Sequence, residues 1–107
     1  MNHTQGYCMI LVACPDMKAA DELAAEMVER RLAACVQITA ITSYYQWKGS
    51  MNRDAEQLLL IKTRAVLYPE IESFINDRHS YEVPEIIMVP VHKGLPAYLN
   101  WIDEVTG

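Results

Sequence analysis

A histidine and a glutamate six residues apart could bind a metal ion. His79 and Glu85 flank a turn that contains Pro84, which can bring their side chains together. Imidazole and carboxylate groups suit copper, zinc and nickel. The structural alternative is a histidine favoured by the dipole at a helix C-terminus, beside an ordinary surface carboxylate. We therefore treat His79 and Glu85 as a candidate site for copper or another divalent cation.

A cysteine at the end of an apolar run is the third candidate metal ligand. Cys14 follows a strand-like segment and precedes an expected helix N-terminus, where backbone N–H groups can lower the pKa of a thiol. A thiolate there would favour Cu(I). The alternative is a small buried residue, because Cys8 lies an even number of positions away and would share its face of the strand. Three cysteines without Cys-x-x-Cys spacing indicate reduced thiols.

Aromatic residues and one lysine form a second candidate site. Tyr45, Trp47, Lys62 and Tyr81 could line a cleft between copies of the chain, where rings and an ammonium group would suit an anionic or planar small ligand. The alternative is the apolar centre of a subunit interface, in which aromatic residues are enriched.

The sequence contains none of the common catalytic motifs that we considered. The chain has no Ser-His-Asp order, no glycine-rich phosphate loop and no His-Glu-x-x-His motif. We therefore expect a binding or sensing protein and not an enzyme.

Composition limits the class of protein. The 107 residues are 51% hydrophobic and leave room for one core, so we expect one domain over residues 1–107. The net charge of −5 disfavours nucleic acid and anionic membrane surfaces as partners. No apolar stretch approaches the roughly 20 residues of a membrane span, and the first residues lack the basic start of a signal peptide. These features predict a cytoplasmic protein.

Hydrophobic periodicity predicts the elements that must position these residues. Tyr7 to Cys14 is apolar on both strand faces, Val36 to Trp47 and Met51 to Thr63 form a long hairpin around a turn at 48–50, and Val83 to Val91 is a short strand bracketed by prolines. Helical spacing follows Asp16, a plausible N-cap, and recurs after Pro69 and around Trp101. The helical positions are Ala20, Leu23, Ala24, Met27 and Val28, then Leu67, Ile71, Phe74 and Ile75, then Tyr98, Trp101, Ile102 and Val105.

The order of these elements predicts an α+β fold. A βαββαβ order with a short C-terminal helix is typical of the ferredoxin-like sandwich, with helices on one face of an antiparallel sheet. Hairpin strands of about a dozen residues would reach roughly 40 Å, farther than so small a domain covers. Their tip carries Tyr44, Tyr45, Trp47 and Met51, an apolar group that oligomerisation would cover.

Four segments together resemble the CutA divalent-ion tolerance family. They are Arg31 to Cys35, Ser43 to Gly49, Glu56 with Leu59 to Thr63, and His79 to Ile86, followed by Gly94, Tyr98 and Trp101. The resemblance implies a ferredoxin-like protomer in a tight homotrimer similar to the PII signalling proteins. It also implies a role in divalent-ion tolerance, with copper or other divalent-ion binding proposed.

The resemblance is incomplete at the metal site. Some members have a cysteine on the first strand and a histidine at the end of the second helix that look like copper ligands. Matching without gaps places Val12 and Arg78 there, leaves Glu85 in register, and makes Cys14 and His79 displaced neighbours. Two hypotheses follow: a divalent-ion-responsive trimer, or a PII-like small-molecule sensor that relays occupancy of clefts between protomers to an unidentified protein partner.

Overall fold

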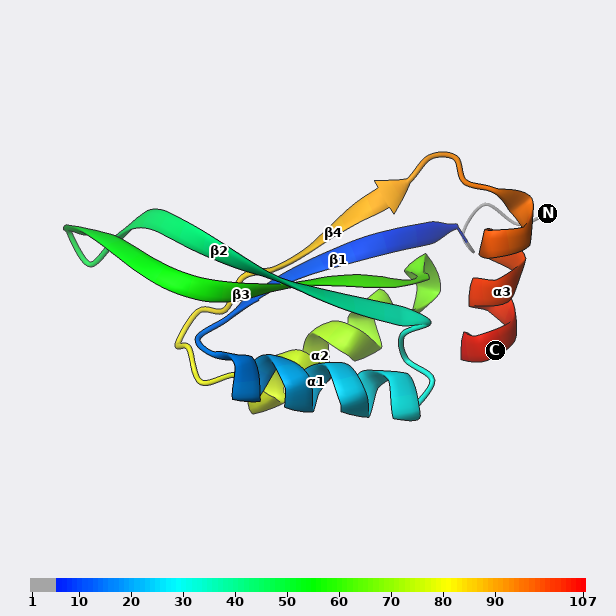
Figure 1. Ribbon diagram of the computed structural model, residues 1–107, viewed down its shortest axis with the longest axis horizontal. Coiled ribbons are helices and arrows are strands. Elements are labelled where there is room, and N and C mark those ends of the chain that lie inside the picture. Colours follow the sequence, from blue (N-terminus) through cyan, green and yellow to red (C-terminus); the bar gives the residue numbers. More distant parts are fainter. Residues whose placement is uncertain (1–5) are drawn as a thin grey trace.

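The computed structural model describes residues 6–107 as a four-stranded sheet with two helices on one face and a third helix at one end (Figure 1). The elements in chain order are β1 (Tyr7–Cys14), α1 (Met17–Glu29), β2 (Cys35–Trp47), β3 (Ser50–Arg64), the 3-10 turn η2 (Ala65–Leu67), α2 (Tyr68–Arg78), β4 (Ile86–Val91) and α3 (Pro96–Thr106).

The sheet has the strand order β2-β3-β1-β4, and every neighbouring pair is antiparallel. This order and the helices between the strands confirm the predicted ferredoxin-like sandwich. The last strand is shorter than expected, because Val83, Pro84 and Glu85 lie in the loop before β4. Pro90 stands within β4, where an edge strand tolerates the missing N–H donor.

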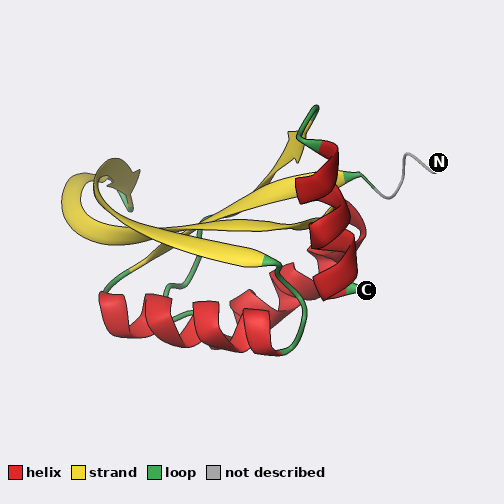
Figure 2. Ribbon diagram, turned by 45° about the vertical axis from the view of Figure 1, so that its right-hand side comes forward, coloured by secondary structure: helices red, strands yellow, loops and turns green. Residues whose placement is uncertain are grey.

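The core lies between the sheet and the helices α1 and α2, which cover one face (Figure 2). Alternate side chains of β1 point into this core, and Ile10 and Val12 are fully buried there. The N-cap of α1 is confirmed, since an Asp16 oxygen accepts a 2.8 Å hydrogen bond from the Ala19 N–H. The α2 residues Ile71, Phe74 and Ile75 complete the core.

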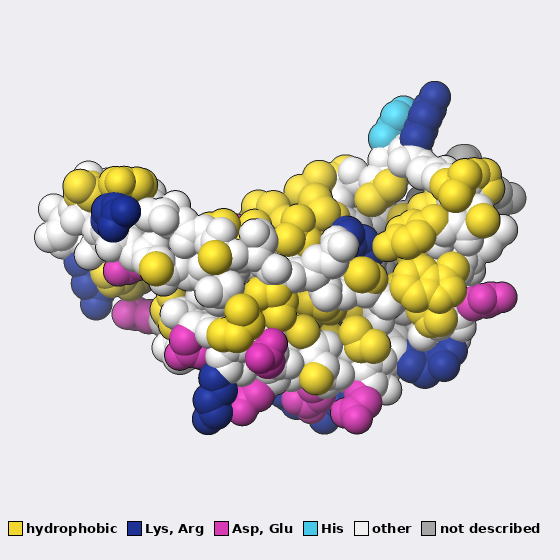
Figure 3. Space-filling model, viewed as in Figure 1, with side chains coloured by type: hydrophobic (Ala, Val, Ile, Leu, Met, Phe, Trp, Pro, Cys, Tyr) yellow, Lys and Arg dark blue, Asp and Glu magenta, His cyan; other side chains and the backbone are white. Residues whose placement is uncertain are grey.

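The opposite face of the sheet is covered only at one end. Cross-strand partners place Leu11, Leu60 and Ile87 side by side on this open face. The end helix α3 is tied to the sheet by a 2.6 Å hydrogen bond from the Tyr7 hydroxyl to Asp103. Exposed hydrophobic side chains remain on β4, including Ile87 at 50% exposure, and hydrophobic groups gather on that side and around α3 in Figure 3.

The hairpin of β2 and β3 extends well beyond the rest of the sheet. Pairing between β1 and β3 ends at Cys14 and Gln57, whereas β2 and β3 stay paired as far as Trp47 and Ser50. The two-residue turn of Lys48 and Gly49 has φ values of 52° and 81°, the left-handed conformation that tight hairpin turns require. The hairpin contributes to the molecule's long axis of 47 Å, and its tip lies far from α3 (Figure 1).

Candidate functional site

A cleft of about 700 Å³ lies between the hairpin and the loop after α2. It brings together three of the four residues predicted to line a ligand cleft: Tyr45 and Trp47 from β2, and Tyr81 from the loop. Its full lining is Ala13, Ser43, Tyr44, Tyr45, Trp47, Glu56, Ser80, Tyr81, Glu82, Val83, Pro84 and Glu85.

A hydrogen bond between Tyr81 and Glu56 joins the two walls of this cleft. The Tyr81 hydroxyl donates to Glu56 Oε2 at 2.6 Å, and Glu56 is only 7% exposed. Burial raises the pKa of the Tyr81 phenol far above its usual range, and the bond to Glu56 raises it further. Tyr45 donates a hydrogen bond to Asp54 on the paired strand, which raises the pKa of its phenol as well. Both phenols are therefore neutral donors at physiological pH.

Lys62 lies apart from the other predicted cleft residues. It faces Cys35 across the β2–β3 ladder and Met9 across the β1–β3 ladder, and its ammonium group donates a hydrogen bond to Gln37. The charged groups that line the cleft are instead carboxylates, namely Glu56, Glu82 and Glu85. The sequence did contain a signal for Glu56, because it continues the polar positions Asn52 and Asp54 along one face of β3.

Both ring nitrogens of His79 make hydrogen bonds within the chain. Nδ1 accepts from the Tyr81 backbone N–H at 3.1 Å, so Nε2 carries the proton and donates to the Ala13 carbonyl at 2.7 Å. His79 is the C-cap residue of α2, and these bonds fix the loop that carries Tyr81 against β1. A metal ion could bind this imidazole only after one bond had broken.

Cys14 is a buried thiol. It is 0% exposed, and burial raises its pKa to about 11, with the charges of Asp16 and Glu56 adding to the effect. This agrees with the alternative interpretation, a small buried residue, because desolvation outweighs any lowering of the pKa by backbone N–H groups. Cys14 and His79 line a second cavity of about 360 Å³, whereas Glu85 lines the cleft at the hairpin.

The described part of the chain does not form a closed copper site. Within residues 6–107, no three His, Cys, Asp or Glu side chains converge closely enough to hold a metal ion. Cys14 is protonated, His79 is committed to two hydrogen bonds, and Glu85 lies in a different cavity. This donor set does not fit a resident copper ion, which needs deprotonated, converging ligands.

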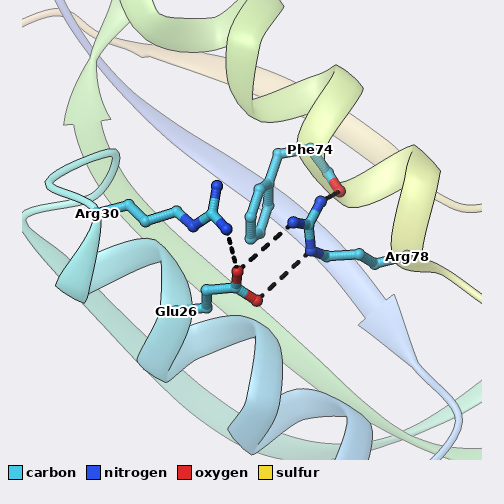
Figure 4. Close-up of polar contacts among 4 residues, drawn as sticks. All are labelled: Glu26, Arg30, Phe74 and Arg78. Atoms are coloured by element: carbon cyan, nitrogen blue, oxygen red, sulfur yellow. Dashed lines mark hydrogen bonds and ion pairs between the residues drawn. The ribbon is translucent and has the colours of Figure 1, made fainter.

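The two residues that replace ligands of the resemblance have structural roles. Val12 is fully buried in the core. The Arg78 guanidinium lies 3.8 Å from the centre of the Phe74 ring, and its Nε lies 3.5 Å from Glu26 Oε1. Arg30 approaches the same ring and pairs with Glu26 at 2.7 Å, so Phe74 lies between two guanidinium groups that share one carboxylate (Figure 4). This cluster joins α1 to α2.

The stability of the chain is expected to fall as the pH rises from 9 to 10. Unfolded thiols titrate near pH 9.0, whereas burial holds the pKa of Cys8 and Cys14 at about 11 in the folded chain. The unfolded state therefore loses protons first, which costs at most about 1.4 kcal/mol of stability per pH unit for each thiol. Urea unfolding at fixed protein concentration measures this slope, and the effect is absent well below pH 9.

A variant with both Cys8→Ala and Cys14→Ala serves as the comparison. Its baseline stability will be lower, but its slope between pH 9 and 10 should be shallower, because the two buried thiols are gone while the tyrosines with raised pKa contribute equally to both proteins. An equal slope in the two proteins would contradict the role of the thiols.

Comparison with known proteins identifies the family. The model of the CutA1 divalent ion tolerance protein matches residues 8–105. The chain belongs to the CutA1 family. It is 49% identical to Protein CutA of Mus musculus over 96 residues, which is 89% of this chain and 54% of the mouse protein. It is 40% identical to the divalent-cation tolerance protein CutA of Thermus thermophilus over 100 residues, covering 92% of this chain and 97% of that protein.

Solved CutA structures share the fold of this CutA1 chain. The periplasmic divalent cation tolerance protein CutA of Archaeoglobus fulgidus superposes with a TM-score of 0.93 at 33% identity, over 94% of this chain and 99% of that one. CutA1 of Oryza sativa superposes with a TM-score of 0.92 at 37% identity, over 97% of each chain. The chain spans about half the length of the mammalian relatives. The names of the family and of the Thermus thermophilus relative describe ion tolerance and no catalysed reaction.

No helix within residues 6–107 is both long and apolar enough to cross a membrane.

Proposed function

We propose that this CutA1 chain is a cytoplasmic homotrimer, without enzymatic activity, that takes part in tolerance of or response to divalent metal ions, copper first among them. The observation that carries the proposal is the match of the divalent-ion tolerance family over residues 8–105. The proposed ion binding is weak to moderate, since the described donors form no closed site.

The exposed apolar surface supports assembly. Ile87, Met88 and Val89 follow one another on the edge strand β4 and are 50%, 39% and 40% exposed. An edge strand with exposed hydrophobic side chains makes a single chain prone to aggregate, and packing against a second copy would bury these side chains. The open sheet face beside β4 and the extended hairpin give two further surfaces for a PII-like trimer.

Surface carboxylates support weak ion binding. Glu85 is exposed beside Glu82 and Pro84, and the chain as a whole carries a net charge of −5. Oxygen ligands on a surface hold divalent ions loosely, because water competes for the ion and the ligands are not held in a fixed geometry. His79 would add a nitrogen ligand only at the cost of its bond to Ala13 or to Tyr81.

Copper titration of the reduced protein in a non-coordinating buffer tests this proposal. Calorimetry should show saturable binding, and Glu85→Gln should weaken it about threefold or more, because one charged ligand is lost. Glu29→Gln removes one carboxylate from the exposed end of α1 and should leave the affinity unchanged. Heats that do not saturate would reject ion binding by this chain, and equal affinities of the two variants would reject the placement at Glu85.

A small-molecule sensor is the second candidate function. The cleft at the hairpin favours it, because a volume of about 700 Å³ and walls of Tyr45, Trp47 and Tyr81 are typical of ligand pockets. Such a sensor would pass the state of the cleft to an unidentified protein partner.

A further inference from the structure

The cleft at the hairpin has the electrostatic character of a cation site. Its lining includes three glutamates and no lysine or arginine. Glu82 is partly neutralised, since its Oε1 lies 3.5 Å from the Lys48 ammonium group. Glu56 and Glu85 remain as the negative groups of the cleft, and an anionic ligand would be repelled by both.

Glu56 has no charged partner among residues 6–107. Its side chain is 7% exposed, yet the structure pairs it only with the neutral Tyr81 hydroxyl, through Oε2. The described residues provide no hydrogen-bond donor to Oε1, and Glu56 is one of the residues that line the cleft. A buried carboxylate is costly unless a cation or several donors balance it. Glu56 Oε1 can therefore accept a hydrogen bond from a positively charged donor that enters the cleft.

The aromatic side chains of the hairpin already contact cations of this chain. The Lys48 ammonium lies 5.6 Å from the centre of the Trp47 ring, and the Arg53 guanidinium lies 5.6 Å from that of Tyr44. Aromatic faces attract cations through the ring quadrupole, and more strongly where water is excluded. Rings and carboxylates thus favour the same sign of charge in this cleft.

An organic cation fits the cleft better than a metal ion does. Metal sites need several converging ligands, and the described residues contain no group of three. An ammonium group needs one or two acceptors, while the apolar walls, Val83 and Pro84 among them, can cover its carbon body.

We infer that the cleft binds a small molecule with a primary ammonium group and an aromatic or apolar body, the ammonium donating to Glu56 and the body packing against Trp47 and Tyr45. This inference rests on the second candidate function, the sensor, and does not require metal binding, although Glu85 belongs to both proposed sites. The cleft within the chain favours a cation because carboxylates line it and Lys62 lies outside it, whereas the predicted cleft between copies, with Lys62, favoured an anionic or planar ligand.

A matched pair of probes tests the inference. The 107-residue protein is titrated by calorimetry with 2-phenylethylamine, which is cationic at pH 7, and with 2-phenylethanol, which has nearly the same shape and no charge. The amine should bind saturably, and the alcohol at least tenfold more weakly, the difference of about 1.4 kcal/mol or more that a charge-assisted hydrogen bond supplies. Equal affinities, or no saturation by the amine up to about 10 mM, would overturn the inference.

Variants locate the binding. Glu56→Gln keeps the shape of the side chain and its acceptor for Tyr81, and should weaken amine binding about tenfold or more. Trp47→Leu should weaken the amine and the alcohol together, because it removes the ring that packs on the common body. Glu29→Gln makes the same change in net charge far from the cleft and should have no effect. Equal losses in Glu29→Gln and Glu56→Gln would show that binding follows net charge, which overturns the site.

The Glu56→Gln variant distinguishes a failure of amine binding from a failure of the proposed ion binding. Glu56→Gln should keep the oligomeric state and copper affinity of the parent, because Glu85 and β4 are unchanged. Loss of amine binding alone in this variant supports the cleft whether or not copper binds. Retained amine binding in this variant rejects the cleft even if copper binds as proposed.

Discussion

Ile87→Asp is expected to convert the proposed trimer into a monomer. Ile87 is 50% exposed on the edge strand β4 and lies beside Leu11 on the open face of the sheet. A carboxylate there would be buried without a partner charge in any interface that uses this face, which costs several kcal/mol for each copy. The folded monomer tolerates the change, since the position is open to water. Sedimentation velocity should show 12.2 kDa particles in place of particles three times that mass.

Val28→Asp is the matched control for assembly. Val28 is 46% exposed, but it lies on α1, on the other side of the molecule from the open face. Its replacement adds the same charge and should leave the trimer intact. If Ile87→Asp stays trimeric, or if both variants dissociate alike, the assembly does not use β4 in the way proposed.

Ile10→Ala is expected to give the largest loss of intrinsic stability, about 3–4 kcal/mol. Ile10 is fully buried in β1, a strand with neighbours on both sides, and it faces Ile61 of β3 and Met88 of β4. Removing its outer carbons forfeits their transfer free energy and leaves a cavity that flanking strands and helices cannot close. The loss is a large share of the 5–15 kcal/mol that stabilises a typical domain.

Urea unfolding measures this loss most cleanly in the Ile87→Asp background, where assembly does not contribute to the free energy of unfolding. Val28→Ala removes an exposed side chain of α1 and should change the stability by less than about 0.5 kcal/mol. A loss of under about 1 kcal/mol for Ile10→Ala would mean that the core around β1 relaxes far more than close packing allows.

The fold could be predicted because local signals agreed with one another. The apolar run ending at Cys14 is a central strand, Asp16 caps the helix that follows, and Pro69 opens the next helix. The boundary of β4 was the exception. Val83 and Pro84 have the composition of a strand, but the His79 ring occupies the Ala13 carbonyl of β1, and pairing of β1 with β4 stops at Val12 and Ile86.

The site was only partly predictable, because its chemistry depends on contacts between distant residues. The sequence pointed to the aromatic residues of the cleft, but it did not predict that the cleft is negatively charged. Glu56 and Lys62 share a face of β3 and are six residues apart, which is about 20 Å along a strand. Only one of them can reach Tyr81. The bond from His79 to Ala13 spans 66 residues, and no local pattern could show that this imidazole is occupied.

The outer half of the hairpin, residues 41–56, has a consequence for local order. It is a ribbon of two strands with no third neighbour, and such ribbons are barely stable in water by themselves. The described chain adds the Tyr81–Glu56 bond near its base and one exposed ion pair, from Lys48 at the turn to Glu82. Backbone amides beyond the Tyr81–Glu56 bond should therefore exchange with solvent through local fraying, long before the core opens. A neighbouring copy or a bound amine would then act on this protein chiefly by raising the fraction of time in which the outer parts of β2 and β3 are paired.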